Sequence, residues 1–176
     1  MLYNLKTHKW LECYYRKLDK DEVQEYVPPN WVFDFTSELN DNFEIFGLET
    51  KEYPGIVQGI VALKVNKHEY TVHLKSAESA DINKYFIHGL KRNGLNPDRI
   101  YKGIGVNLVA FACQYSLEND CDGHVNLISK SETIPFYESI GGEPLFDGGQ
   151  IIVFLEKAGQ KLATEYFSGG AIQWLD

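Results

Sequence analysis

Two glycines at the start of an apolar helical segment constrain this 176-residue chain more than any other feature. Gly103 and Gly105 flank Ile104, and apolar residues then recur at helical spacing to about Glu118. A glycine lets the backbone approach another group closely, and the first amides of a helix are unpaired and carry partial positive charge. Lys102 adds a cation. The segment predicts a seat for a phosphate, although a tight loop before a helix is the alternative interpretation.

The common phosphate-binding signatures do not match this segment. A Walker loop needs Gly-Lys-Ser/Thr, and no such triplet follows Gly105. A dinucleotide fingerprint needs a third glycine, whereas Leu108 stands at that position. The glycines therefore indicate close backbone approach, and the class of ligand has to come from the rest of the chain.

The rest of the chain predicts an α/β (α+β) fold with a mixed, mostly antiparallel sheet flanked by helices. Runs of aromatic or β-branched residues predict strands at 8–18, 42–53, 56–65, 69–76 and 124–129, and a last hairpin that pairs about 144–147 with 150–156. Helical spacing predicts helices from Asp19 or Asp21 to before Pro28, and over about 81–91, 132–139 and 158–167. No linker divides the chain, so we expect a single domain spanning residues 1–176.

Residues 31–41 allow two interpretations. Trp31, Phe33 and Phe35 could form a flap over a substrate pocket, or their rings could simply pack on the core.

The charge of the chain restricts its partners. The formal net charge is −8 and the isoelectric point is about 5.1. This balance argues against non-specific binding to nucleic acid or to an anionic membrane, and it is compatible with a cationic substrate. No apolar run is long enough to span a membrane.

The three cysteines, Cys13, Cys113 and Cys121, show no metal-ligand spacing, so we expect no metal site. Their odd number and the absence of a signal peptide argue against a disulfide framework and favour the cytoplasm. Cys113 lies in the apolar helix, where a core role is the simplest interpretation.

The order of these parts resembles the GNAT superfamily of N-acetyltransferases. Lys-Gly-Ile-Gly at 102–105 is similar to the family's acyl-CoA pyrophosphate loop, and Pro-Phe-Tyr-Glu-Ser-Ile-Gly-Gly at 135–142 is similar to its Phe-Tyr-x-x-x-Gly-Phe helix. The strand at 124–129 lies between them. The chain departs from the pattern at Ile100, where the loop normally begins with Gln or Arg, and at Gly142, where an aromatic is usual. Residues 80–99 form an insertion relative to the family, which could shape the substrate side or serve no such role.

This resemblance implies direct transfer of an acetyl group from acetyl-CoA to an amine of a small molecule or peptide. It implies that the pyrophosphate binds the amides of residues 103–106, namely Gly103, Ile104, Gly105 and Val106, beside Lys102. It also places the pantetheine arm and the thioester oxygen along the strand edge formed by Leu74, Lys75 and Ser76.

Tyr137 matches the family position of the acid that protonates the departing thiolate. A thiol has a pKa of about 8.5 and a tyrosine of about 10, so a tyrosine proton can move across as the thiolate forms. The alternative is that Tyr137 only packs its ring on the core.

The acceptor amine must lose a proton before it attacks, because an ammonium has no lone pair. His73 and Glu69 on the predicted central strand are candidates for the base, and Glu78 is a weaker one. Strand side chains alternate, which puts Glu69 and His73 on one face. Each could equally be an ordinary polar residue of a strand face.

Two other functions remain open to the sequence. One is a non-catalytic acyl-CoA-binding or protein-interaction module on the same fold, which the departures at Ile100 and Gly142 favour. The other is nucleic-acid binding, to which the cluster of Lys84, Lys91, Arg92 and Arg99 would contribute, although the acidic balance counts against it. The oligomeric state is not fixed by the sequence, and a homodimer is possible.

Overall fold

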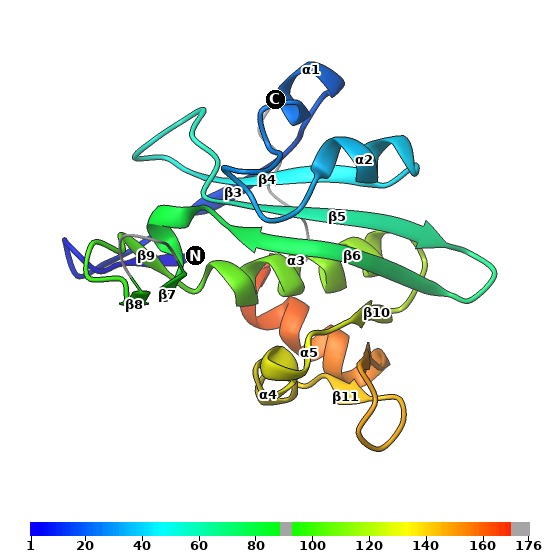
Figure 1. The fold of residues 1–176 in the computed structure, drawn as a ribbon. Helices are drawn as coiled ribbons and strands as arrows, with labels where there is room; N and C mark the ends of the chain where they lie inside the picture. Colours follow the sequence, from blue (N-terminus) through cyan, green and yellow to red (C-terminus); the bar gives the residue numbers. More distant parts are fainter. Residues whose placement is uncertain (89–92, 170–176) are drawn as a thin grey trace.

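A seven-stranded mixed sheet organises the molecule, as the computed structural model shows for residues 1–88 and 93–169 (Figure 1). Its strand order is β11-β12-β10-β6-β5-β4-β3. The strands are β3 Cys13–Lys17, β4 Glu44–Thr50, β5 Gly59–Asn66, β6 Thr71–Ser79, β10 Val125–Ile128, β11 Glu143–Pro144 and β12 Ile151–Phe154. Only the central pair, β6 and β10, is parallel among these strands. The predicted mixed, mostly antiparallel sheet is therefore confirmed.

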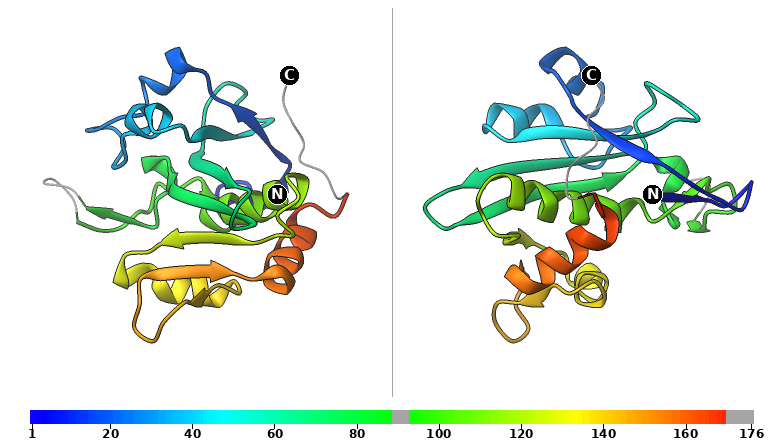
Figure 2. Two further views of the ribbon diagram at one scale, coloured as in Figure 1. Left: turned by 90° about the vertical axis from the view of Figure 1, so that its right-hand side faces the viewer. Right: turned by 180° about the vertical axis from the view of Figure 1, so that it is seen from behind.

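The parallel pair requires a crossover, and α3 (Ile104–Glu118) is the helix within it. Residues on every side of α3 are buried, because the sheet covers one face and α5 (Glu156–Tyr166) packs beside it (Figure 2). Phe111 and Cys113 of α3 belong to the main core. Burial raises the pKa of Cys113 to about 12, which fits a core thiol.

The opposite face of the sheet carries two short helices, α1 (Lys20–Val23) and α2 (Phe35–Asn40) (Figures 1 and 2). Asp19 begins α1 with a capping box, as its place before the helix predicts. Phe35 is fully buried in a second core cluster, and Trp31 and Phe33 pack around it. Core packing is thus the observed role of these three rings.

The strands β6 and β10 run side by side for only part of their length. Their ladder joins Val72–Leu74 to Val125–Leu127, whereas β6 continues to Ser79. A register shift against β5 leaves Lys75 as a bulged residue just after the ladder ends. The second half of β6 therefore has no ladder partner on its β10 side among the described residues.

The N-terminus of α3 lies against the end of β6, and Gly59 makes this approach possible. A Cβ built on Gly59 would lie 2.6 Å from Cγ2 of Ile104 and 3.3 Å from the carbonyl oxygen of Glu78. Only glycine at this position leaves room for the first turn of α3 beside the open part of β6.

The segment between β6 and α3 differs from its prediction. A helix over 81–91 is wrong: a single 3-10 turn, η1 (Asp81–Asn83), is followed by a hairpin of β7 (Phe86–His88) and β8 (Asn93–Leu95). The side-chain amide of Asn96 donates to the carbonyls of Asp81, Ile82 and Lys84. A longer helix would need these carbonyls as acceptors for its own backbone hydrogen bonds. Residues 89–92 of the predicted helix lie outside the described part.

Other boundaries also shift. The predicted strand 8–18 is divided into β2 (Lys9–Leu11) and β3, and β2 joins β1 (Leu2–Asn4) and β9 (Tyr101–Lys102) in a separate small sheet. The helix predicted at 132–139 is η2 (Ser131–Thr133) followed by α4 (Ile134–Ser139). The last hairpin pairs β11 with β12.

None of the helices in the described ranges has the length and apolarity to cross a bilayer.

The close approach at Gly59 yields a stability prediction. We expect Gly59→Ala to lower the free energy of unfolding by about 1–3 kcal/mol, because the new methyl group overpacks the contact with Ile104. Gly169→Ala is the control, since a Cβ there meets nothing within 4 Å. Urea denaturation monitored by fluorescence measures both variants, and equal stability of the two would contradict the role assigned to Gly59.

Candidate active site

The two glycines lie where β9 passes into α3, at the start of the helix, as the sequence predicts. Gly103 is the N-cap in the left-handed region, with φ of 94°, and no side chain caps the helix. The first intrahelical bond of the helix runs from the amide of Asn107 to the carbonyl of Gly103, at 3.0 Å. The amides of Ile104, Gly105 and Val106 precede it, so they are the unpaired donors of the first turn. No acidic residue stands in that turn.

Lys102 lies at the same junction. It is exposed, and its Nζ is 5.4 Å from the centre of the Tyr3 ring. The pairing of Tyr3 with Lys102, and a 2.7 Å bond from the amide of Leu5 to the carbonyl of Ile100, anchor the loop before α3. The side chain of Ile100 packs against the main core. The cation thus comes from Lys102, whereas Ile100 supplies no polar contact.

Helix α4 brings the second motif to this junction. A Cβ on Gly105 would lie 3.4 Å from Cζ of Phe136, so the edge of the Phe136 ring lies beside Gly105 in the first turn of α3. The Phe136 and Tyr137 rings meet edge to face, with centroids 5.0 Å apart. The fold therefore brings one residue of each motif, Gly105 and Phe136, next to each other.

Tyr137 is half-buried and packs against the main core. Its hydroxyl forms no hydrogen bond with the residues that the structure describes. Burial raises the pKa of Tyr137 above its ordinary value, because the phenolate would lose solvation. The phenol therefore keeps its proton at neutral pH.

The predicted strand edge lies where β6 leaves β10. Leu74 forms the last parallel pair, with Leu127, and its side chain is buried. Lys75 is the exposed, bulged residue. Ser76 follows, and its buried hydroxyl donates to Oε1 of Glu38 on α2. The backbone of these residues forms the first part of the open edge of β6.

His73 lies one residue before the open edge, on the face that α2 covers. Its Nδ1 is 2.5 Å from Oδ1 of Asn126, its register partner on β10, and its ring centre is 5.8 Å from that of Phe43. The imidazole thus joins the two parallel strands just before they separate.

Glu69 is not brought to this region. The strand β6 begins at Thr71, so the prediction that Glu69 shares a strand face with His73 is wrong: Glu69 is exposed in the β5–β6 turn. Lys67 of the same turn bonds the carbonyl of Asn119 at the C-terminal end of α3. Glu69 therefore lies at the opposite end of α3 from the glycine junction.

Glu78 is engaged in structural contacts. Its carboxylate accepts the amides of Val32 and Phe33 at 3.0–3.1 Å and pairs with Lys84 at 2.7 Å. These bonds fasten the loop before α2 to the end of β6.

The predicted cationic cluster is also engaged within the fold. Lys84 pairs with Glu78 and Asp81, each at 2.7 Å, and Arg99 donates to the carbonyls of Asn83 and Tyr101. Lys91 and Arg92 lie outside the described residues. The two described cations thus give no support to a nucleic-acid surface.

Sequence reasoning missed Glu38. This α2 residue is 7% exposed, its Oε1 accepts the Ser76 hydroxyl, and its Oε2 has no hydrogen-bond partner among the described residues. Burial is the largest cause that raises the pKa of Glu38. The one available signal was the spacing of Phe35, Glu38 and Leu39, which puts a carboxylate on the apolar face of a helix.

Solved structures share the fold of this chain. A complex of AtaTR bound with acetyl-CoA superimposes with a TM-score of 0.58 at 16% identity, over 86% of this chain and 98% of that one. A bacterial toxin gives a TM-score of 0.55 at 14% identity, over 86% and 95% of the chains. A GNAT-family acetyltransferase from Staphylococcus aureus Mu50 gives 0.51 at 14% identity, over 81% and 98%. The chain has the GNAT fold.

The GNAT fold was recognisable in the sequence only through its short motifs. No protein-family model matches the sequence, and no curated protein matches it. The structural relatives are 14–16% identical, so what they share with this chain is the order and packing of elements.

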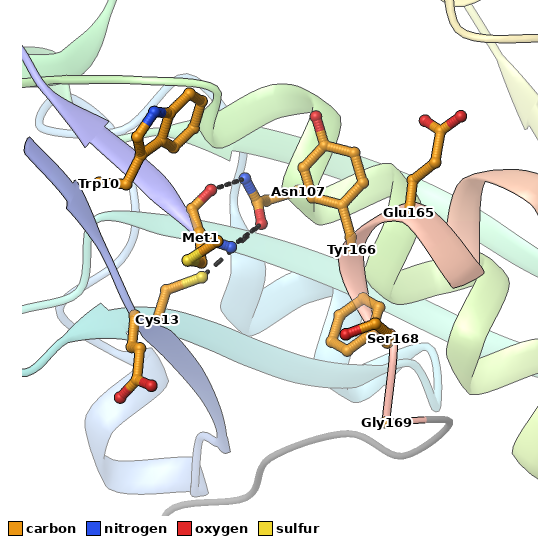
Figure 3. A pocket seen from close by; sticks show the side chains of 10 residues that line it. Met1, Trp10, Cys13, Asn107, Glu165, Tyr166, Ser168 and Gly169 are labelled. Carbon is orange, nitrogen blue, oxygen red and sulfur yellow. Dashed lines mark hydrogen bonds between the residues drawn. The ribbon is translucent and has the colours of Figure 1, made fainter.

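A separate cavity of about 590 Å³ lies beside Asn107 of α3 (Figure 3). Trp10, Cys13 and Tyr166 are among its lining residues, and Tyr137 and Ser76 are not. Asn107 links this cavity to the glycine junction, because its Oδ1 accepts from Met1 and Cys13 while its Nδ2 donates to the carbonyl of Gly103 at 2.8 Å. Asn107 thereby helps to hold the N-cap in place.

Proposed function

We propose that this protein is an acetyl-CoA-dependent N-acetyltransferase that acts on an amine of a small molecule or peptide. The observation that carries the proposal is the contact of the Phe136 ring with Gly105, which joins the two motifs at the open end of the sheet. The GNAT fold supports it, as does the acetyl-CoA named in the related AtaTR complex. We further propose that residues 1–176 act as one domain in the cytoplasm, where free cysteines such as Cys113 stay reduced.

The residues at the junction suit acetyl-CoA. The proposed seat for a diphosphate consists of the three unpaired amides of residues 104–106 and the exposed Lys102. Gly105 has no side chain to block the approach, and no carboxylate stands in the first helical turn. The open edge of β6 offers backbone groups to an extended chain of amides such as pantetheine. When bound, acetyl-CoA supplies an activated acetyl group on a thiol leaving group.

The protein groups then have separate tasks. In this proposal, a backbone amide on the open edge of β6, about residues 74–76, donates to the acyl oxygen as it gains negative charge. The phenol of Tyr137 keeps its proton at neutral pH because burial raises its pKa, and in this proposal its hydroxyl donates to the departing sulfur as negative charge develops there. His73 lies beside this opening, with its Nδ1 2.5 Å from Oδ1 of Asn126.

Binding of acetyl-CoA tests the diphosphate seat. We expect the wild-type protein to bind it in titration calorimetry, and Gly105→Val to weaken binding because its side chain crowds the amides. Gly105→Ala is a matched intermediate: its methyl group would lie 3.4 Å from Phe136, an ordinary contact, so the fold is kept while the seat narrows. Unchanged affinity in both variants, with melting temperatures like the wild type, would contradict this placement.

Turnover tests the role of Tyr137. With a panel of alkyl amines and a thiol reagent to follow release of CoA, we expect Tyr137→Phe to lower kcat by about 100-fold or more, the usual contribution of a general acid. The affinity for acetyl-CoA should stay the same. Tyr70→Phe, at an exposed tyrosine in the β5–β6 turn, is the control.

The outcome of this assay separates the two functions. Equal turnover of Tyr137→Phe and the wild type would remove Tyr137 from the mechanism. Tight binding of acetyl-CoA without acetylation of any amine would contradict the enzyme proposal and indicate a non-catalytic acyl-CoA-binding module.

A further inference from the structure

The carboxylate of Glu38 is an exception to the rule that buried polar groups are fully hydrogen-bonded. Its Oε2 is buried and lacks a partner among the described residues, whereas its Oε1 accepts from the Ser76 hydroxyl. Leaving a charged oxygen buried and unpaired is costly, so the ionised form of Glu38 destabilises the fold, a cost that a functional role would explain.

The position of the pair connects it with the candidate active site. Ser76 directly follows the bulged Lys75 and lies beyond Leu74, the last residue of β6 that pairs with β10. Phe35 and Ala62 of the second core cluster provide an apolar setting on this face. Glu38 thus reaches the strand from the α2 side at the point where the strand edge becomes open.

The charges around Glu38 come from three elements. Burial is the largest cause that raises the pKa of Glu38, the Ser76 hydrogen bond and the charge of Lys75 on β6 lower it, and Asp34 and Asp41 at the ends of α2 raise it. Along the same strand, His73 is paired with Asn126 and Glu78 with Lys84. From β5, Lys64 donates to the carbonyl of Asp41. Among the described residues, Glu38 thus has the buried carboxylate oxygen that lacks a hydrogen-bond partner.

We propose that Glu38, acting through the Ser76 hydroxyl, accepts the proton that a cationic alkyl amine must lose before acetylation. This inference rests on the proposed acetyltransferase function and names its substrate class. Alkyl ammonium groups have a pKa of about 10 and are charged at neutral pH, whereas aryl amines need no such base. The acidic balance of the chain, with a net charge of −8, favours the same class.

The proton transfer balances within the pair. One N–H proton of the ammonium passes to the Ser76 oxygen while the Ser76 proton passes to Oε1 of Glu38, so the hydroxyl is restored. The products are a neutral amine with a lone pair and a neutral carboxylic acid, which later returns its proton to solvent. Burial raises the pKa of Glu38, which makes this carboxylate a stronger base than an exposed one.

Two variants separate this role from a structural one. Glu38→Gln keeps an oxygen that can accept the Ser76 hydroxyl, and Ser76→Ala removes the relay but keeps the carboxylate. Two controls change exposed residues outside the pair: Glu25→Gln, just after α1, and Ser37→Ala, on α2.

The first readout is kcat/KM against pH at saturating acetyl-CoA, with the alkyl amine that reacts fastest in the panel. The wild type should rise with pH and reach a plateau above the pKa of Glu38. In Glu38→Gln, kcat/KM should be about 100-fold lower at neutral pH and should keep rising with pH towards the pKa of the amine itself. The KM for acetyl-CoA should not change. Ser76→Ala should behave like Glu38→Gln. Wild-type rates and a retained plateau in Glu38→Gln would overturn the inference and leave the acetyltransferase function standing.

The second readout needs no substrate. Because the folded state raises the pKa of Glu38, it binds this proton more tightly than the unfolded state does. The resulting stabilisation is complete below the ordinary carboxyl pKa and is lost as the pH rises through the raised value. Relative to the wild type, Glu38→Gln should therefore gain stability as the pH rises from about 4 to about 8 in urea denaturation, whereas Glu25→Gln should not. If the stability difference between Glu38→Gln and the wild type does not change with pH, the inference is overturned. If no amine of the panel is acetylated, the enzyme proposal is overturned with it.

Discussion

The parallel pairing of β6 with β10 is the constraint on which the rest of the molecule depends. Two parallel strands require the chain to return from the end of the first to the start of the second, and α3 makes this return. Its N-terminus therefore lies at the end of β6, where the strand has lost its partner, and the contact of Gly59 with Ile104 fixes it there. Unpaired helix amides and an unpaired strand edge come together as a consequence of topology.

The two faces of β6 give the site two distinct chemistries. On the α3 face, backbone amides and Lys102 favour negative charge. On the α2 face, Glu38 offers a carboxylate next to Ser76. In the proposed mechanism, an anionic cofactor binds from one side and a cationic amine from the other, and they meet where β6 and β10 separate. Tyr137 on α4 completes this arrangement because Phe136 packs over Gly105.

Features with a local cause could be predicted from the sequence. The bounds of α3, the cap at Asp19 and the three strands β4 to β6 follow from periodicity, capping residues and turns. The glycine junction was also predictable, because a left-handed N-cap favours glycine at position 103. The contact between α3 and α4 came only from the resemblance to a family, since no local pattern links Gly105 to Phe136.

The remaining features depend on distant contacts. The predicted helix at 81–91 failed because Asn96 binds the carbonyls of the η1 region. The placement of Glu69 failed because a two-residue shift in the start of β6 moves it into a turn. Glu38 was not predicted because its partner, Ser76, is on a different element, and only the packing of α2 on the sheet brings them together. In the sequence, a buried carboxylate looks like any other helix residue until its surroundings are known.

A crystal structure of the protein with acetyl-CoA tests the location of the cofactor most directly. We expect diphosphate oxygens within hydrogen-bond distance, about 2.7–3.2 Å, of the amides of Ile104, Gly105 and Val106, with the pantetheine arm along the open edge of β6 beyond Leu74. A diphosphate bound elsewhere, for example in the cavity beside Trp10, with these amides left in contact with water, would contradict the proposed site.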